Sequence, residues 1–340
     1  MIKQPLYTFD KSTNVMTFEY NDSNEFSALE IIYEYVKDIK QAHVCLSGGV
    51  DSQFWIRVCE HFDIPYTAST YLTTWEGSPI NTEDYVCAQL TAKKFNCKWD
   101  TIEIDLQEFY NSDRPYELAK KYKTDSQQIC LHLEYLSLIK DRYADTTFLM
   151  GGDAMYLQMV TADGGPDILG LNGHRLKDLL VYENFFKQNS IEYVKDIVYL
   201  DAKMPSQIFK LNIEFVKQHK QHLSVDTNDS QSHQMENLPV KSFLWESILP
   251  GTVNTLIKVG GFERVKKYFA MKTGIYNYFD KKYREPLEQL MKNDNDMIQD
   301  PSKVKIIVKN KLDMHHYIEE FDSTVKEVDS KPLTLYLFDF

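Results

Sequence analysis

Residues 41–165 alternate between short apolar runs and amphipathic segments, and this alternation limits the folds open to the chain. The strand-like runs cover 43–46, 65–72, 99–104 and 146–150, and the helical patterns cover 51–62, 82–95 and 127–142. Strands separated by helices typically form a parallel sheet with helices on both faces. The sequence therefore predicts an α/β fold with a doubly wound, mostly parallel sheet.

The segments on either side of this alternation have different patterns. Residues 6–20 predict a β-hairpin, and residues 25–39 predict a helix. Beyond residue 165, helical patterns dominate, at 176–187, 190–198, 206–222, 242–249 and 261–292. We therefore divide the chain into an N-terminal hairpin and helix (1–40), an α/β domain (41–165) and a mainly helical part (166–340).

Two segments of the last part have a distinct composition. Residues 223–239 are polar and predict a mobile loop or a lid. Leu333–Phe338 carries large apolar side chains in a strand-like pattern. A chain end this apolar is usually held against the body of the protein or against a partner. A homodimer joined by this strand is therefore one hypothesis.

The composition argues against nucleic acid as a partner, against a membrane span and against an oxidising compartment. The chain has 38 Lys and Arg against 50 Asp and Glu, a net charge of −12, which disfavours nucleic acid as the partner. No apolar run approaches the ~18 residues of a membrane span. The five cysteines form no Cys-x-x-Cys pair, so a disulfide framework is not expected. These features are typical of a cytoplasmic protein.

The segment Ser47-Gly48-Gly49-Val50-Asp51-Ser52 lies between a predicted strand and a predicted helix. Adjacent glycines let backbone N–H groups approach an anion, and the following helix directs its N-terminal dipole at the same anion. Asp51 would repel a phosphate, but it could hold Mg²⁺, which prefers oxygen ligands shared with phosphates. The alternative is a Gly-Gly chain reversal with Asp51 or Ser52 at the start of the helix.

This hexapeptide resembles the PP-loop of the N-type ATP pyrophosphatases, a superfamily that includes asparagine synthetase, NAD synthetase, GMP synthetase and several tRNA-modifying enzymes. The resemblance implies a Rossmann-like sheet of the adenine nucleotide alpha hydrolase type. It also implies cleavage of ATP between the α and β phosphates, with an adenylate as intermediate. The string is specific for the superfamily but not for one of its members.

Two further segments make the chain most similar to the synthetase domain of asparagine synthetase. Asn81–Phe95 leads into Trp99–Asp105, which resembles an acidic helix followed by a strand in that family. Phe148–Ala154 resembles its second glycine- and acid-rich motif, but without the glutamates. Ile2 stands where the family's glutaminase domain has a nucleophilic Cys, so glutamine-derived ammonia is not expected.

The resemblance implies a set of site residues. Asp51 and Asp153 would hold Mg²⁺ and act in catalysis. The residues that would bind ATP are Leu46, Ser47, Gly48, Gly49, Val50, Asp51, Ser52, Tyr71, Gly151 and Gly152. Tyr71 could also be an ordinary strand aromatic, and Asp125, Ser126 and Gln127 could face substrate or cap a helix. The resemblance also implies a lysine that assists adenylation. The candidates are Arg264, Lys266, Lys267 and Lys272, and the alternative for each is an exposed position on a helix.

The leading hypothesis is an ATP- and Mg²⁺-dependent ligase that forms an acyl-adenylate and then an amide. Its partner would be a small molecule or peptide that supplies a carboxylate and an amine. One alternative is a PP-loop enzyme that modifies a nucleobase or a tRNA. Another is a catalytically silent protein that binds ATP without consuming it.

Overall fold

The computed structural model describes most of the chain, and the description below is confined to those residues. They are 2–151, 160–162, 165–167, 173–194, 196–222, 238–251, 267, 271, 274–275, 277–279, 281–290, 292, 305–310 and 315–332. Of the loop predicted at 223–239, residues 223–237 lie outside the described residues, and the last two residues belong to a helix that begins at Leu238. The predicted strand Leu333–Phe338 and most of 252–304 also lie outside the described residues.

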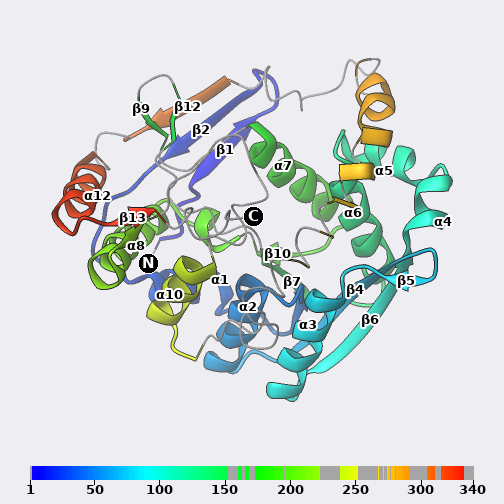
Figure 1. The fold of residues 1–340 in the computed structure, drawn as a ribbon, viewed down its shortest axis with the longest axis horizontal. Helices are drawn as coiled ribbons and strands as arrows, with labels where there is room; N and C mark the ends of the chain where they lie inside the picture. The colour runs from blue at the N-terminus through cyan, green and yellow to red at the C-terminus, as the bar shows by residue number, and fades with distance from the viewer. Residues whose placement is uncertain are drawn as a thin grey trace.

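A mostly parallel sheet forms the centre of the fold, as the alternating pattern predicts (Figure 1). Within the described residues, five of its strands are parallel and a short sixth strand pairs antiparallel with the end of β4. In spatial order the parallel strands are β10 (Tyr193–Val194), β7 (Thr147–Met150), β3 (Ala42–Cys45), β4 (Tyr66–Trp75) and β6 (Lys98–Asp105), and the sixth is β5 (Ser78–Pro79).

The direction of strand addition reverses between β3 and β7. From β3 the chain adds β4 and then β6 on one side, and it later returns to add β7 and β10 on the other side. In open α/β sheets, ligands bind in the crevice at the carboxyl ends of the strands where this reversal occurs. The two segments that leave this point are the Ser47–Ser52 loop after β3 and Gly151 after β7.

Two apolar cores cover the two faces of the sheet because side chains alternate along a strand. Leu149 of β7 packs in one core with helices α1 (Ala28–Val36), α2 (Val50–His61), α3 (Thr82–Lys94) and α8 (Met204–His219). Its neighbour Phe148 packs in the other core with α4 (Leu106–Asn111), α5 (Arg114–Tyr122), α6 (Gln127–Ile139) and α7 (Gly173–Gln188). Figure 1 shows α2 and α3 on the opposite side of the sheet from α6 and α7.

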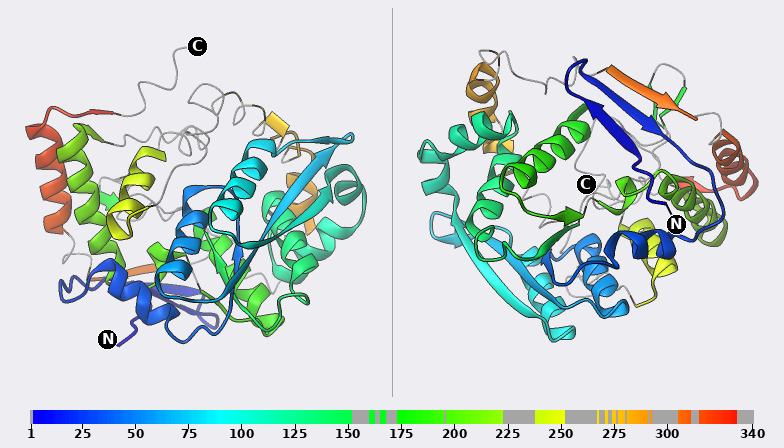
Figure 2. Two further views of the ribbon diagram at one scale, coloured as in Figure 1. Left: turned by 90° about the horizontal axis from the view of Figure 1, so that it is seen from below. Right: turned by 180° about the vertical axis from the view of Figure 1, so that it is seen from behind.

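A second sheet joins the two ends of the chain (Figure 2). The predicted hairpin is confirmed as β1 (Tyr7–Asp10) and β2 (Val15–Glu19), and β12 (Lys305–Lys309) pairs with β2 in parallel. Helix α12 (His315–Glu327) packs beside α8 at this end of the molecule. Two short pairs complete the described strands, β8 (Val160–Ala162) with β9 (Gly165–Asp167) and β11 (Gln221–His222) with β13 (Lys331–Pro332).

One predicted helix is wrong. Residues 190–198 contain the strand β10 and the first part of a 3₁₀ turn at Ile197–Tyr199. The apolar spacing of Ile191, Val194 and Ile197 also fits a helix, but these residues fill places at the edge of the sheet and in both cores. Tertiary pairing with β7 therefore decides the local structure. None of the helices among the described residues is long and apolar enough to cross a lipid bilayer.

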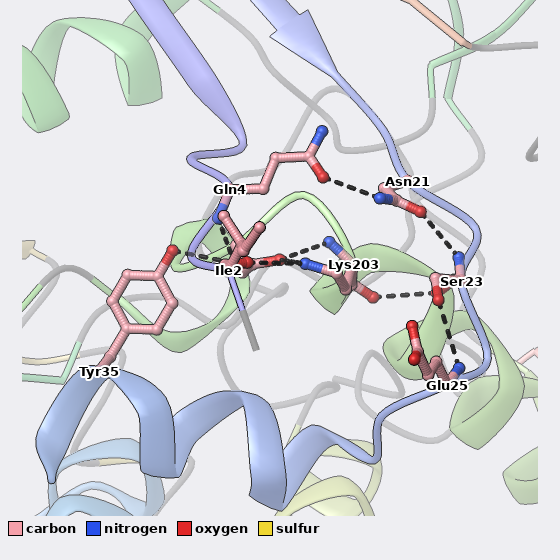
Figure 3. Close-up of polar contacts among 9 residues, drawn as sticks. Ile2, Gln4, Asn21, Ser23, Glu25, Tyr35 and Lys203 are labelled. Carbon is pink, nitrogen blue, oxygen red and sulfur yellow. Dashed lines mark hydrogen bonds and ion pairs between the residues drawn. The ribbon is translucent and has the colours of Figure 1, made fainter.

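A buried carboxylate ties the N-terminal segment to the turn before α8 (Figure 3). Asp201 is 0% exposed and accepts hydrogen bonds from the Gln4 backbone N–H at 2.9 Å and from the Tyr35 hydroxyl at 2.9 Å. The ammonium of Lys203, also buried, lies 3.1 Å from its other oxygen. The backbone of Ala202 pairs with Gln4 and with Asn21 in the same region.

Asp201→Ala should lower the free energy of unfolding by about 3–5 kcal/mol, because it leaves the Lys203 ammonium buried without its carboxylate. Urea denaturation followed by circular dichroism measures the loss. Glu320→Gln is the matched control, since the Lys217–Glu320 ion pair is about half exposed on both sides and should contribute no more than about 1 kcal/mol. Equal losses in the two variants would show that Asp201 does not organise this region.

A second buried polar group lies inside the sheet. The imidazole of His43 contacts the hydroxyl groups of Thr67 at 2.9 Å and Ser69 at 2.7 Å, and it stacks on Tyr143 with a ring separation of 3.7 Å. Burial lowers the pKa of His43 to about 3, and the nearby Asp100 carboxylate offsets only part of this effect. The histidine is therefore neutral in the folded protein at any pH near neutrality.

The folded pKa of His43 lies below the value of about 6.5 in an unfolded chain, so the unfolded state binds more protons as the pH falls below 6.5. Between pH 7 and pH 5.5 the wild-type protein should lose about 1 kcal/mol more stability than His43→Asn. Urea midpoints at the two pH values measure this difference. Parallel losses in both proteins would contradict the assignment of a neutral buried histidine.

Candidate functional site

The Ser47–Ser52 loop connects the carboxyl end of β3 directly to the first turn of α2. Its own hydroxyl groups hold the loop in shape. The Ser52 hydroxyl donates to the Gly49 carbonyl at 3.0 Å and accepts from the Ser47 N–H at 3.2 Å. Gly49 is the N-cap of α2 and supplies no side-chain acceptor, so the first turn directs its N–H groups and its dipole beyond the sheet edge. This is the geometry of an anion site.

Two glycines allow the loop to pack this closely. Gly48 has a φ of +82°, and a Cβ there would lie 2.2 Å from the carbonyl oxygen of Asp84. A Cβ on Gly151 would lie 2.7 Å from the backbone nitrogen of Ser52 and 3.0 Å from the carbonyl carbon of Asp51. The carboxyl end of β7 is therefore in direct contact with the start of α2, and the sequence motifs after β3 and β7 meet.

The carboxylate of Asp51 is held by two side chains of α10 (Leu238–Ile248). The ammonium of Lys241 lies 2.9 Å from Oδ2, and the indole N–H of Trp245 donates to Oδ1 at 2.7 Å. Lys241 and Trp245 are 7% and 1% exposed. The site therefore combines a cation, a carboxylate and the N-terminus of a helix at the carboxyl edge of the sheet.

The sequence did not predict the contact of Lys241 with Asp51, and the basic residues named as candidates stand later in the chain. Arg264, Lys266 and Lys272 lie outside the described residues, and Lys267 is exposed. One signal could have found the pair. Trp245 lies in the helix predicted at 242–249 and Lys241 stands directly before it, so a helix extended by one turn would place the two side chains, four residues apart, on one face.

The structure shows the surroundings of Leu46, Val50 and Tyr71, and their part in nucleotide binding stays a prediction. Leu46 is buried, and its backbone bonds to Ser69 and Thr70 of β4. The Tyr71 ring packs on Tyr135, and its hydroxyl contacts His132 Nε2 at 3.3 Å. The side chain of Tyr71 is thus engaged with α6. Val50 is buried at the start of α2.

The remaining sequence candidates divide into two groups. Gly152 and Asp153 lie outside the described residues, so their part in the site stays a prediction. Ser126 accepts a hydrogen bond from the N–H of Ile129 and caps α6, as its alternative interpretation predicts. Gln127 is buried and accepts a hydrogen bond from the Tyr110 hydroxyl.

Asp51 fits a magnesium ion that arrives with a nucleotide. Among the described residues, no group of three or more His, Cys, Asp or Glu side chains could hold a metal by itself. Mg²⁺ is typically bound by one or two carboxylates together with phosphate oxygens and water. Asp51, a half-buried carboxylate in the first turn of α2, could be one such ligand.

The chain matches no protein-family model and no curated protein. Its structure is similar, at low scores, to solved structures. Three of these are a predicted subunit of tRNA methyltransferase from Methanocaldococcus jannaschii (16% identity, 47% of this chain and 68% of that chain, TM-score 0.26), NMN synthetase from Francisella tularensis (14%, 76% and 97%, TM-score 0.28) and NH3-dependent NAD synthetase from Campylobacter jejuni (17%, 72% and 93%, TM-score 0.28). Scores this low establish neither a common family nor a common activity.

Gly48→Ala should destabilise the protein by about 1–3 kcal/mol or more and abolish nucleotide binding, because a Cβ would collide with backbone at a positive φ. Gly49→Ala is the matched control for the loss of stability, since the φ of Gly49 is −75° and the nearest neighbour of an added Cβ would be the Ser47 hydroxyl at 3.4 Å. Denaturation and calorimetry with ATP measure both effects. Equal free energies of unfolding for the two variants would contradict the close contact between Gly48 and the Asp84 carbonyl.

Proposed function

We propose that this protein is an ATP- and Mg²⁺-dependent ligase that cleaves ATP between the α and β phosphates. The observation that carries the proposal is the meeting of Asp51, Lys241 and the N-terminus of α2 at the switch point of the sheet. An anion site, a carboxylate and an ammonium group together suit a nucleoside triphosphate. The PP-loop resemblance of Ser47–Ser52 agrees with this chemistry.

The loop would bind the phosphates that leave as pyrophosphate. Backbone N–H groups of Gly48, Gly49 and Val50 and the hydroxyl of Ser47 would donate to phosphate oxygens, as in other helix N-terminal anion sites. Asp51, with Asp153 as a predicted second ligand, would hold Mg²⁺. The bound ion would neutralise charge that develops on the β and γ oxygens.

Lys241 would add a second cation at the same place. Its ammonium is already at the edge of the loop, 2.9 Å from Asp51, on a flexible side chain that can reach a phosphate oxygen. A fixed positive charge beside the leaving group stabilises the transition state of adenylation. This residue replaces the later basic cluster as the leading candidate for the assisting lysine.

The reaction would proceed in two displacements. A carboxylate oxygen of the substrate attacks the α phosphorus, the bond from this phosphorus to the α–β bridging oxygen breaks, and pyrophosphate leaves. An amine then attacks the carbonyl carbon of the acyl-adenylate and loses a proton, and AMP leaves as the amide forms. The substrate would be a small molecule or a peptide, because the net charge of −12 disfavours a nucleic acid.

Asp51→Asn should lower the rate of AMP formation by at least about 10²-fold, because it removes the charge that holds Mg²⁺ near the phosphates. The assay follows ATP and Mg²⁺ with pooled carboxylates and amines and resolves AMP from ADP by chromatography. Asp141→Asn is the control, since Asp141 is an exposed surface carboxylate and its loss should leave the rate unchanged.

The products decide among the hypotheses. AMP with pyrophosphate, stimulated by carboxylates and amines, would support the ligase. Stimulation by nucleobases instead would favour a base-modifying enzyme. ATP binding without hydrolysis in the presence of every substrate pool would favour a nucleotide-binding protein that has no catalytic activity. ADP with phosphate would refute cleavage between the α and β phosphates.

A further inference from the structure

The two oxygens of the Asp51 carboxylate have partners of different kinds. Oδ1 accepts from a neutral indole N–H, whereas Oδ2 is paired with an ammonium ion. Both partners come from α10, which lies 190 residues and more along the chain from Asp51. The difference between the two partners indicates different roles for the two oxygens.

Trp245 is a rigid partner. Its ring is buried and stacks on Phe54 of α2 with centroids 4.7 Å apart and an interplanar angle of 26°. An indole has only two side-chain torsions, so this packing fixes the position of its N–H. The hydrogen bond to Oδ1 therefore sets the rotation of the Asp51 carboxylate about its own side chain.

Lys241 is an exchangeable partner. Its charge is compact and stands on a flexible four-carbon stem, so it can leave Oδ2 without a change in the backbone. The ammonium of Lys241 also occupies the position beside Oδ2 where a metal ion would have to bind. A divalent cation would bind the carboxylate oxygen at about 2.0–2.1 Å, and two cations within ~4 Å of each other repel strongly in a half-buried site.

Helix α10 is anchored independently of this carboxylate. Arg57 of α2 donates to the Pro250 carbonyl at 2.5 Å, and Glu246 accepts from the Gly251 N–H at 2.9 Å. Phe243 packs edge-on against Phe215 of α8. None of these contacts involves Lys241, so they do not depend on its pairing with Asp51.

We infer, on the basis of the proposed function, that Oδ2 of Asp51 exchanges the Lys241 ammonium for a divalent cation when the nucleotide binds, while Trp245 keeps Oδ1. The triphosphate group of a nucleotide would make this exchange possible in two ways. Its oxygens share the cation with Asp51, and they provide a new partner for Lys241. In the absence of nucleotide, Lys241 suppresses binding of the free cation, and Trp245 is a positioning residue.

The first test measures free Mn²⁺ by electron paramagnetic resonance with no nucleotide present. Lys241→Met should bind Mn²⁺ at least about tenfold more tightly than the wild-type protein, because the competing charge is gone. Lys217→Met, which removes an exposed lysine of α8, should not change the affinity. Equal Mn²⁺ affinity in the wild type and in a folded Lys241→Met variant would overturn the exchange.

The second test observes the tryptophan indole groups of the wild-type protein by NMR, and a variant is needed only to assign the Trp245 resonance. The chain has four tryptophans, so ¹⁵N-labelled indole groups give few resonances, and Trp245→Phe identifies the one bonded to Asp51. Saturating Mg²⁺ with ATP should leave this resonance at a hydrogen-bonded shift, with the Trp99 indole, bonded to Thr70, as the internal reference. A move to the shift of a free indole would overturn the role of Trp245.

The two tests are separable from the proposed function. Tighter Mn²⁺ binding by Lys241→Met in a protein that never forms AMP would support the exchange and refute the ligase. Formation of AMP by the wild type together with unchanged Mn²⁺ affinity in the variant would support the ligase and overturn the exchange.

Discussion

The contact between the start of α2 and the carboxyl end of β7 is the constraint on which the site depends. Gly151 meets the backbone of Asp51 and Ser52, and Gly48 meets the carbonyl of Asp84, with no room for a Cβ at either place. The indole N–H of Trp55 strengthens this contact by donating to the Met150 carbonyl at 2.9 Å. Because backbone meets backbone here, the first turn of α2 is held at the edge of the sheet where the strand order reverses.

A second layer of interactions links the site to the rest of the molecule. Helix α10 bridges α2 and α8, through Trp245 on Phe54 and Phe243 on Phe215. The N-terminal end of α8 directly follows the turn that contains Asp201. This carboxylate also holds the N-terminal segment through its hydrogen bonds with Gln4 and Tyr35. A continuous set of packed elements therefore connects the N-terminal segment, through α8, to the helix that contacts Asp51.

Local patterns predicted much of this fold correctly, and the reasons are physical. The strands predicted from short apolar runs and the helices predicted at 51–62, 82–95 and 127–142 are present, because burial against the sheet agrees with these local patterns. The prediction over 190–198 was wrong because a short apolar segment suits either structure, and pairing with β7 selected a strand. The helices α4, α5 and α12, and the strand β12, were not predicted, although α5 and α12 are clearly amphipathic.

The sequence by itself determined that a glycine-containing loop follows β3, because the left-handed backbone conformation of Gly48 is one that residues with a Cβ rarely adopt. It also determined the alternation that builds the parallel sheet. Only the tertiary structure decided which side chains surround Asp51. Lys241 and Trp245 reach it from a helix 190 residues or more away, and no local pattern specifies a contact over that separation. The folding of α10 between α2 and α8 places them there.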